Sequence, residues 1–255
     1  MAIDLRRRYS SPPAASRPYS DDERPAIRHD QGMEALFTPI LAFHIATGLG
    51  ACVVGVAPIL TRKGSPAHRW SGRVFVGLMA ALLVAAWVMT AMHFSAYLLG
   101  LTGTATYHVF SGVRVLGRKR PDLRVEDRAR PIDWLATFGI IGVGVGVMTL
   151  ILTGRSDGPP AIAISLGSTA LVFGAWDLWR FARPRAWPFS PNLWTYEHLV
   201  KMLSAYSAAL SAFSGNFLTF VPAPWSQLWP SVLFPTLAVI WVASLIVQRR
   251  GFSIA

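Results

Sequence analysis

The sequence predicts an all-α, polytopic membrane protein built as a bundle of seven transmembrane helices. Of its 255 residues, 53% are hydrophobic and 15% are charged, whereas soluble domains usually contain about 25% charged residues. The mean hydropathy is +0.41. The apolar residues are gathered into seven runs, each close to the ~20 residues that a helix needs to cross about 30 Å of hydrocarbon.

We expect three segments along the chain: a flexible N-terminal tail (1–33), a seven-helix transmembrane domain (34–250) and a short C-terminal tail (251–255). Residues 74–113 contain no Lys, Arg, Asp or Glu and are too long for one crossing, so two spans joined by a tight turn near His93 are predicted there. The expected spans are residues 36–60, 74–93, 96–116, 134–153, 160–181, 196–220 and 230–248.

The distribution of Lys and Arg predicts the orientation, because cytoplasmic loops carry an excess of these residues. The loop after the first span has four, the loop after the third has seven, the loop after the fifth has three and the C-terminus has two. The loops on the other side contain only Arg155. The sequence therefore predicts a multi-pass protein of the cell inner (plasma) membrane, with its N-terminus outside and its C-terminus in the cytoplasm.

The basic residues lie between apolar runs, although the net charge of +11 could also suggest a nucleic-acid partner. This placement predicts contact with anionic lipid headgroups at the cytoplasmic loops and argues against nucleic acid. Cys52 is the only cysteine, which excludes an intrachain disulfide and a cysteine-based metal site within one chain. The patterns H-x-x-x-H and H-E-x-x-H are absent, which argues against a zinc hydrolase.

Four histidines within the apolar runs are candidate haem ligands, because neutral imidazoles on facing helices can bind iron axially. His44 and His93 are expected in the outer half of the membrane, and His108 and His198 in the inner half. Two pairs of this kind would suit two stacked b-type haems in a transmembrane redox protein. Depths estimated from the helical rise differ by roughly 8 to 10 Å within each pair, which weakens the fit. The alternative is that each histidine only bonds to a neighbouring helix.

The run 196–220 carries a second pattern, a polar stripe on one helical face. The stripe could line a path for a small solute or a proton, with Asp177 as a further intramembrane charge. Alternatively, Glu197 and Lys201 form an ion pair, the serines are small packing residues, and the protein is a non-catalytic membrane scaffold. The stripe comprises Glu197, Lys201, Ser204, Ser207, Ser211 and Ser214.

The first predicted hairpin contains the basic turn R-K-G-S-P-A-H-R-W-S-G-R (62–73). It resembles the hairpin of a family of uncharacterised bacterial multi-pass membrane proteins, and the segment 197–213 also resembles a recurring segment of such proteins. This resemblance implies an integral membrane protein and no particular activity. Similarity to cytochrome b561 is weaker and rests only on histidines within helices. The residues of the hairpin that carry the resemblance are His44, Arg62, Lys63, Gly64, His68, Arg69, Gly72 and Arg73.

Overall fold

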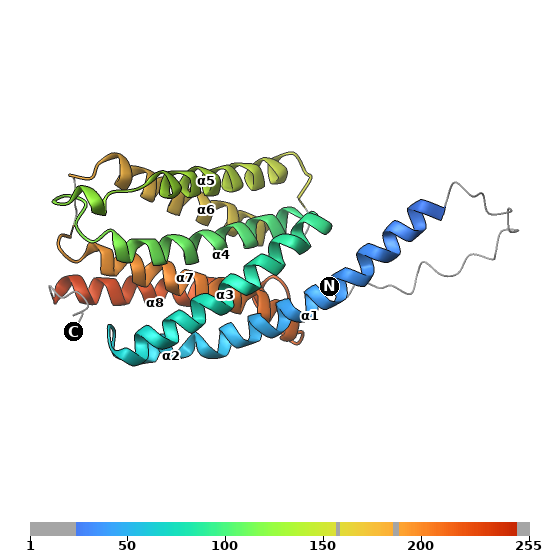
Figure 1. Cartoon of the computed structure of the whole chain (residues 1–255), viewed down its shortest axis with the longest axis horizontal. Helices are drawn as coiled ribbons and strands as arrows, with labels where there is room; N and C mark the ends of the chain where they lie inside the picture. Colours follow the sequence, from blue (N-terminus) through green and yellow to red (C-terminus); the bar gives the residue numbers. More distant parts are fainter. Residues whose placement is uncertain (1–23, 157–158, 186–188, 249–255) are drawn as a thin grey trace, which may run out of the picture.

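The computed structural model of the chain describes residues 24–156, 159–185 and 189–248. Within these residues the regular structure is entirely helical, which confirms the predicted all-α class. Figure 1 shows long helices running along one common direction, with the short α2 continuing α1. The helices are α1 (Arg24–Val54), α2 (Val56–Leu60), α3 (Pro66–Met92), α4 (Ala96–Arg114), α5 (Pro131–Leu152), α6 (Pro160–Ala182), α7 (Leu193–Phe217) and α8 (Trp225–Val247), with short 3-10 turns η3 (Val115–Gly117) and η4 (Val125–Asp127).

Five helical segments are long and apolar enough to cross a membrane by themselves, which supports the predicted membrane class. Helices α4 and α7 are not among the five, because their sequences are interrupted by polar and charged residues. The number of crossings and the orientation stay predictions. The five segments are Ala35–Leu60, Pro66–Met92, Val125–Leu152, Pro160–Ala182 and Trp225–Val247.

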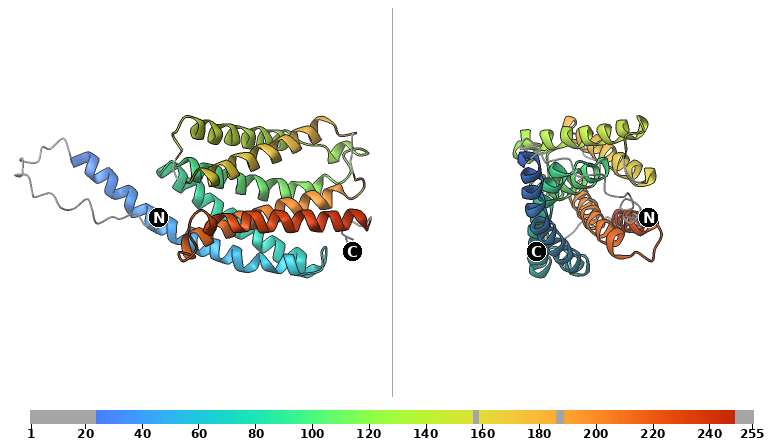
Figure 2. Two further views of the ribbon diagram at one scale, coloured as in Figure 1. Left: turned by 180° about the vertical axis from the view of Figure 1, so that it is seen from behind. Right: turned by 90° about the vertical axis from the view of Figure 1, so that its right-hand side faces the viewer.

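Helix α4 occupies the centre of the bundle, where it contacts α3, α5, α6 and α7. The end-on view in Figure 2 shows the remaining helices around it, with α5 and α6 on one side and α1 and α3 on another. Helix α7 packs between α4 and α8 and also contacts α1. Most polar side chains of α4 and α7 are therefore covered by protein, whereas the outer helices expose apolar side chains such as Val84, Val172 and Val239.

The antiparallel order of the helices places three basic loops at one end of the bundle, seen at the left of Figure 1. We call this the basic end; among the described residues it comprises the turn 61–65, the loop 115–130 and the loop residues 183–185 and 189–192. The opposite end is formed by the turns that follow α3, α5 and α7. The loops predicted to share one side of the membrane therefore lie together.

Two helices begin more than five residues before the predicted spans. Helix α3 begins at Pro66 and not at residue 74, because the Ser65 side chain accepts a hydrogen bond from the backbone N–H of His68 (3.2 Å) and Pro66 suits the first helical position. His68 and the arginines beside it therefore belong to a helix and not to a loop. Helix α1 begins at Arg24, inside the predicted tail; residues 1–23 and 249–255 lie outside the described residues.

Candidate functional site

A pocket of about 500 Å³ opens at the basic end, between the α1–α3 hairpin and helices α7 and α8. Its walls are mainly apolar and include Phe75, Leu199, Leu203, Tyr206 and Trp241. No Asp or Glu is present among the described residues that line it. The ionisable side chains of the lining are instead basic or imidazole groups: Lys63, His68, Arg69, Arg73, Lys119 and His198.

Two glycines shape this pocket. A side chain at Gly72 would meet no atom within 4 Å, so the absence of a side chain there leaves open space beside α3. Gly55 has the opposite environment, because an added Cβ would lie 2.6 Å from the ring of Tyr206. The close approach lets the Tyr206 hydroxyl donate to the Cys52 carbonyl (3.1 Å), which fastens α7 to α1 behind the pocket.

Two histidines of the lining are held in the same way. The Nδ1 atom of His68 lies 3.1 Å from the Pro58 carbonyl oxygen, and Nδ1 of His198 lies 2.9 Å from the Gly112 carbonyl oxygen. A carbonyl oxygen only accepts hydrogen bonds, so Nδ1 must donate in both contacts. In the neutral ring, the lone pair is then on Nε2, the nitrogen that can bind a metal.

The lysines of the lining are not neutralised by carboxylates. Lys63 donates to the carbonyl oxygens of Pro58 (2.7 Å) and Ile59 (2.6 Å) at the end of α2, and its Nζ lies 4.6 Å from the ring centre of Trp241. Burial lowers the pKa of Lys63 to about 8. Lys119 lies over the ring of Trp194 at 5.0 Å. The pocket therefore has a positive electrostatic potential.

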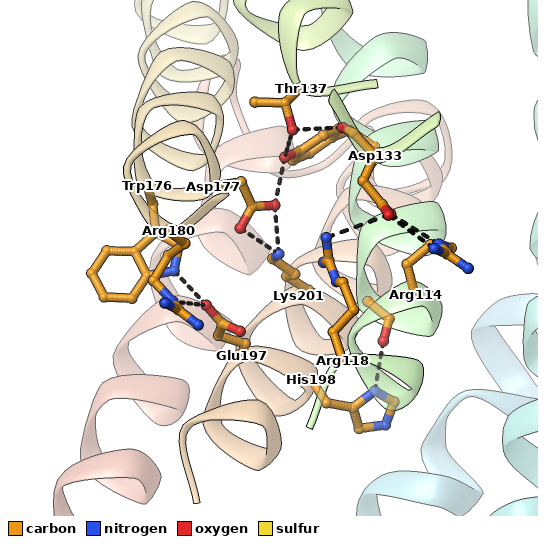
Figure 3. Close-up of polar contacts among 12 residues, drawn as sticks. Arg114, Arg118, Asp133, Thr137, Trp176, Asp177, Arg180, Glu197, His198 and Lys201 are labelled. Atoms are coloured by element: carbon orange, nitrogen blue, oxygen red, sulfur yellow. Dashed lines mark hydrogen bonds and ion pairs between the residues drawn. The ribbon is translucent and has the colours of Figure 1, made fainter. Parts of the chain in front are cut away.

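A second group of polar residues lies deeper in the bundle, and Figure 3 shows it. We call it the charge cluster; it comprises the pairs Lys201–Asp177 and Arg180–Glu197 with the hydroxyls of Tyr107 and Thr137. Lys201 and Asp177, both 1% exposed, form two hydrogen bonds of 2.8 and 2.6 Å. The Tyr107 hydroxyl also donates to Asp177 (2.5 Å), and its oxygen lies 3.1 Å from the hydroxyl of Thr137. The cluster thus joins α4, α5, α6 and α7.

Glu197 does not pair with Lys201, contrary to one interpretation of the sequence. It accepts hydrogen bonds from Arg180 (3.2 Å) and from the indole N–H of Trp176 (2.8 Å), both on α6. Asp177 and Arg180 lie three residues apart on α6, and their partners Lys201 and Glu197 lie four residues apart on α7, in the reverse order. Both spacings are close to one helical turn. Charges of opposite sign on two antiparallel helices therefore face each other, and each long side chain reaches across to α6 and not along its own helix.

A third ion pair belongs to the same region. Arg114 at the end of α4 binds both carboxylate oxygens of Asp133 (2.9 and 2.8 Å), and Arg118 lies 3.4 Å from the same group. The Asp133 carboxylate also accepts a hydrogen bond from the backbone N–H of Arg130, the residue that caps the N-terminus of α5. These contacts fix the loop between α4 and α5 against the bundle.

The polar stripe of α7 does not form one continuous face. Lys201 turns toward α6, whereas Ser211 contacts Ser231 (3.1 Å) and Ser214 donates to the Ser226 carbonyl, both on α8. Ser207 is buried and Ser204 is half-buried. Ser211 and Ser214 therefore join α7 to α8, while the charges join it to α6.

Of the four predicted haem ligands, only His198 lines the pocket. Nδ1 of His44 bonds to the Leu82 carbonyl (3.3 Å), and the ring of His93 packs edge-on against Phe37 at 4.9 Å. His108 is 2% exposed and packs against Phe173 at 4.4 Å, beside the charge cluster. These three rings therefore have different neighbours, whereas His198 lines the same pocket as His68.

The sequence did not predict His68 as a ligand, because the predicted spans place this residue in a loop between two helices. The signal was present, since Ser-Pro at positions 65 and 66 is a typical helix start.

Comparison of the chain with protein-family models, with curated proteins and with solved structures found no match in any of the three. The resemblance of the hairpin to an uncharacterised family therefore stays a prediction.

Proposed function

We propose that this integral membrane protein binds an apolar anion in the pocket at its basic end. One observation carries the proposal: an apolar pocket of about 500 Å³ contains several cationic groups and no carboxylate among its described lining residues. The volume lies within the ~300–1,000 Å³ range of ligand pockets. A ligand with a large apolar body and one or more acidic groups would satisfy both the walls and the charges.

Charge is the selective element of this site. Lys63 and Lys119 contact carbonyl oxygens and indole rings, and Arg73 is exposed, so an incoming anion displaces no internal counter-ion from these three groups. A cation would be repelled, and a neutral apolar molecule would leave the positive potential uncompensated. Anions are therefore favoured over other apolar molecules of the same size.

We also propose that all seven long helices cross the membrane and that the basic end faces the cytoplasm. The enclosed positions of α4 and α7 explain how they could cross despite their polar residues. The excess of Lys and Arg in the loops supports the orientation, with the N-terminus outside, in the plasma membrane. The pocket would then open where the anionic lipids of the inner leaflet are available.

The test uses the full chain in nanodiscs of zwitterionic lipid and a fluorescent fatty acid as the probe. We expect saturable binding that the double variant Arg73→Gln, Lys119→Gln weakens by about tenfold or more, since it removes two charge-assisted contacts. A fluorescent alcohol with the same chain should bind more weakly than the acid.

Arg155→Gln is the matched control, because it removes a positive charge at the opposite end of the bundle. Its affinity for the probe should equal that of the unchanged protein. Equal loss in the control and the pocket variant, or equal binding of acid and alcohol, would contradict the proposal.

A further inference from the structure

We infer that the apolar anion is an iron porphyrin, and that His68 and His198 bind its iron through their Nε2 atoms. This inference rests on the proposed function, because it identifies the ligand of the same pocket. It replaces the ligand pairs predicted from the sequence with one pair that joins α3 to α7.

The first argument is the hydrogen bonding of the two rings. Histidines that bind metals almost always donate their other ring N–H to a backbone carbonyl or a carboxylate, which fixes the tautomer and the orientation of the ring. His68 and His198 both do so, at 3.1 and 2.9 Å, and both line the same pocket from different helices. Haem sites in helical bundles are built from side chains on facing helices in this way.

The second argument separates a porphyrin from a free metal ion. Two imidazoles alone leave a divalent ion without the further ligands that it needs, and the pocket supplies no carboxylate among its described residues. The positive charges of Lys63 and Lys119 also disfavour a bare cation. A metal can therefore enter this pocket only with an anionic ligand of its own, and a porphyrin dicarboxylate is such a ligand.

The third argument separates a porphyrin from a simple lipid. A fatty acid would contact the apolar walls and the cations, but it has no metal that the two oriented Nε2 atoms could bind. A haem uses all three features: Phe75, Leu203 and Tyr206 can cover the macrocycle, Arg73 and Lys119 can receive its carboxylates, and the imidazoles can bind its iron.

The experiment adds haem to the purified full-length protein in nanodiscs and records its absorbance spectrum. After reduction with dithionite, the expected spectrum is a sharp Soret band with the split visible bands of six-coordinate, low-spin ferrous iron. His68→Gly and His198→Gly should each abolish the low-spin form, and free imidazole should restore it, because the small base can replace the missing side chain in the space that it leaves.

His44→Ala and His93→Ala are the controls, since neither ring lines the pocket, and they should retain the low-spin spectrum. Binding of the fluorescent fatty acid by the two glycine variants shows that they are folded. A low-spin spectrum that persists in both glycine variants would overturn the inference. Binding of fatty acid without a low-spin haem spectrum would overturn it and leave the proposed function intact, whereas binding of neither would refute both.

Discussion

The charge cluster contains buried ionisable groups and the pocket contains half-buried ones, and the two regions differ in what surrounds each charge. In the cluster, Lys201 is matched by Asp177 and Arg180 by Glu197, each across two helices. In the pocket, Lys63 contacts carbonyl oxygens and the ring of Trp241, and Lys119 contacts the ring of Trp194. The cluster is electrostatically complete, whereas the pocket retains an attraction for an external anion.

The contrast shows how to separate structural from functional charges inside a membrane protein. An intramembrane charge is a functional candidate by default, because it is costly to bury. That default weakens where each charge has a partner of opposite sign at hydrogen-bond distance, since the pair then holds helices together. It strengthens where positive groups face a cavity without a counter-ion.

The largest expected effect is the loss of one partner of the cluster. Lys201→Met leaves the Asp177 carboxylate buried and unpaired, so we expect a loss of about 3–5 kcal/mol of stability. Asp177→Asn should have a comparable effect on Lys201. Thermal unfolding in detergent measures both.

The double variant Lys201→Met, Asp177→Asn should recover much of that loss, because no unpaired charge remains. Strictly additive losses would show that the two side chains do not act as a pair. Single variants that unfold at the temperature of the unchanged protein would show that the cluster is not structural.

A smaller effect distinguishes two glycines. Gly144→Ala places a Cβ 2.9 Å from Leu171 on α6 and should lower the unfolding temperature, because packed cores tolerate extra volume poorly. Gly72→Leu should reduce binding of the fluorescent fatty acid and leave the unfolding temperature unchanged, because its side chain enters open space at the pocket. An unfolding temperature that falls equally in both variants would contradict the assignment of Gly72 to an open cavity.

A pH change should move binding and stability in opposite directions. The folded-state pKa of Lys63 is about 8, below its ordinary 10.5, so the unfolded chain binds more protons between these values and stability rises with pH in that window. Affinity for the fatty acid should fall as pH rises through about 8, because Lys63 loses its charge while Arg69, Arg73 and Lys119 retain theirs. The titration is carried out above pH 7.5, where the imidazoles of His68 and His198 are neutral, so that their protonation does not contribute to the measured change.

Lys63→Met is the control for this titration, and it should remove most of the pH dependence of affinity. An unchanged affinity profile in Lys63→Met would assign the titration to another group of the pocket.

The smallest effect is expected at a half-buried, solvent-accessible ion pair of the basic end. Arg120 binds Asp122 in a bidentate contact of 3.0 and 2.8 Å, and this lowers the pKa of the Asp122 carboxyl. Solvent screens such pairs, so Asp122→Asn should leave the unfolding temperature unchanged within error. A decrease as large as that of Lys201→Met would remove the distinction between buried and solvent-accessible pairs.

Composition and the spacing of apolar runs were sufficient to predict the helical class and the five segments that are long and apolar enough to cross a membrane, because hydropathy is a local property of each segment. The same is true of the grouping of the basic loops, since consecutive antiparallel helices place every second loop at one end. The sequence also marked Lys201 and Asp177 as unusual, because a charge within an apolar run is visible without a fold.

The tertiary structure decided which of these groups meet. The partner of Lys201 depends on how α6 and α7 are rotated around α4, and the spacing along α7 alone favoured Glu197. Likewise, His198 could be recognised as an intramembrane histidine, but its shared pocket with His68 required two helices separated by more than a hundred residues in the chain. Hydropathy determines which segments are buried in the membrane, whereas contacts between distant side chains depend on helix rotation and packing, which no local pattern encodes.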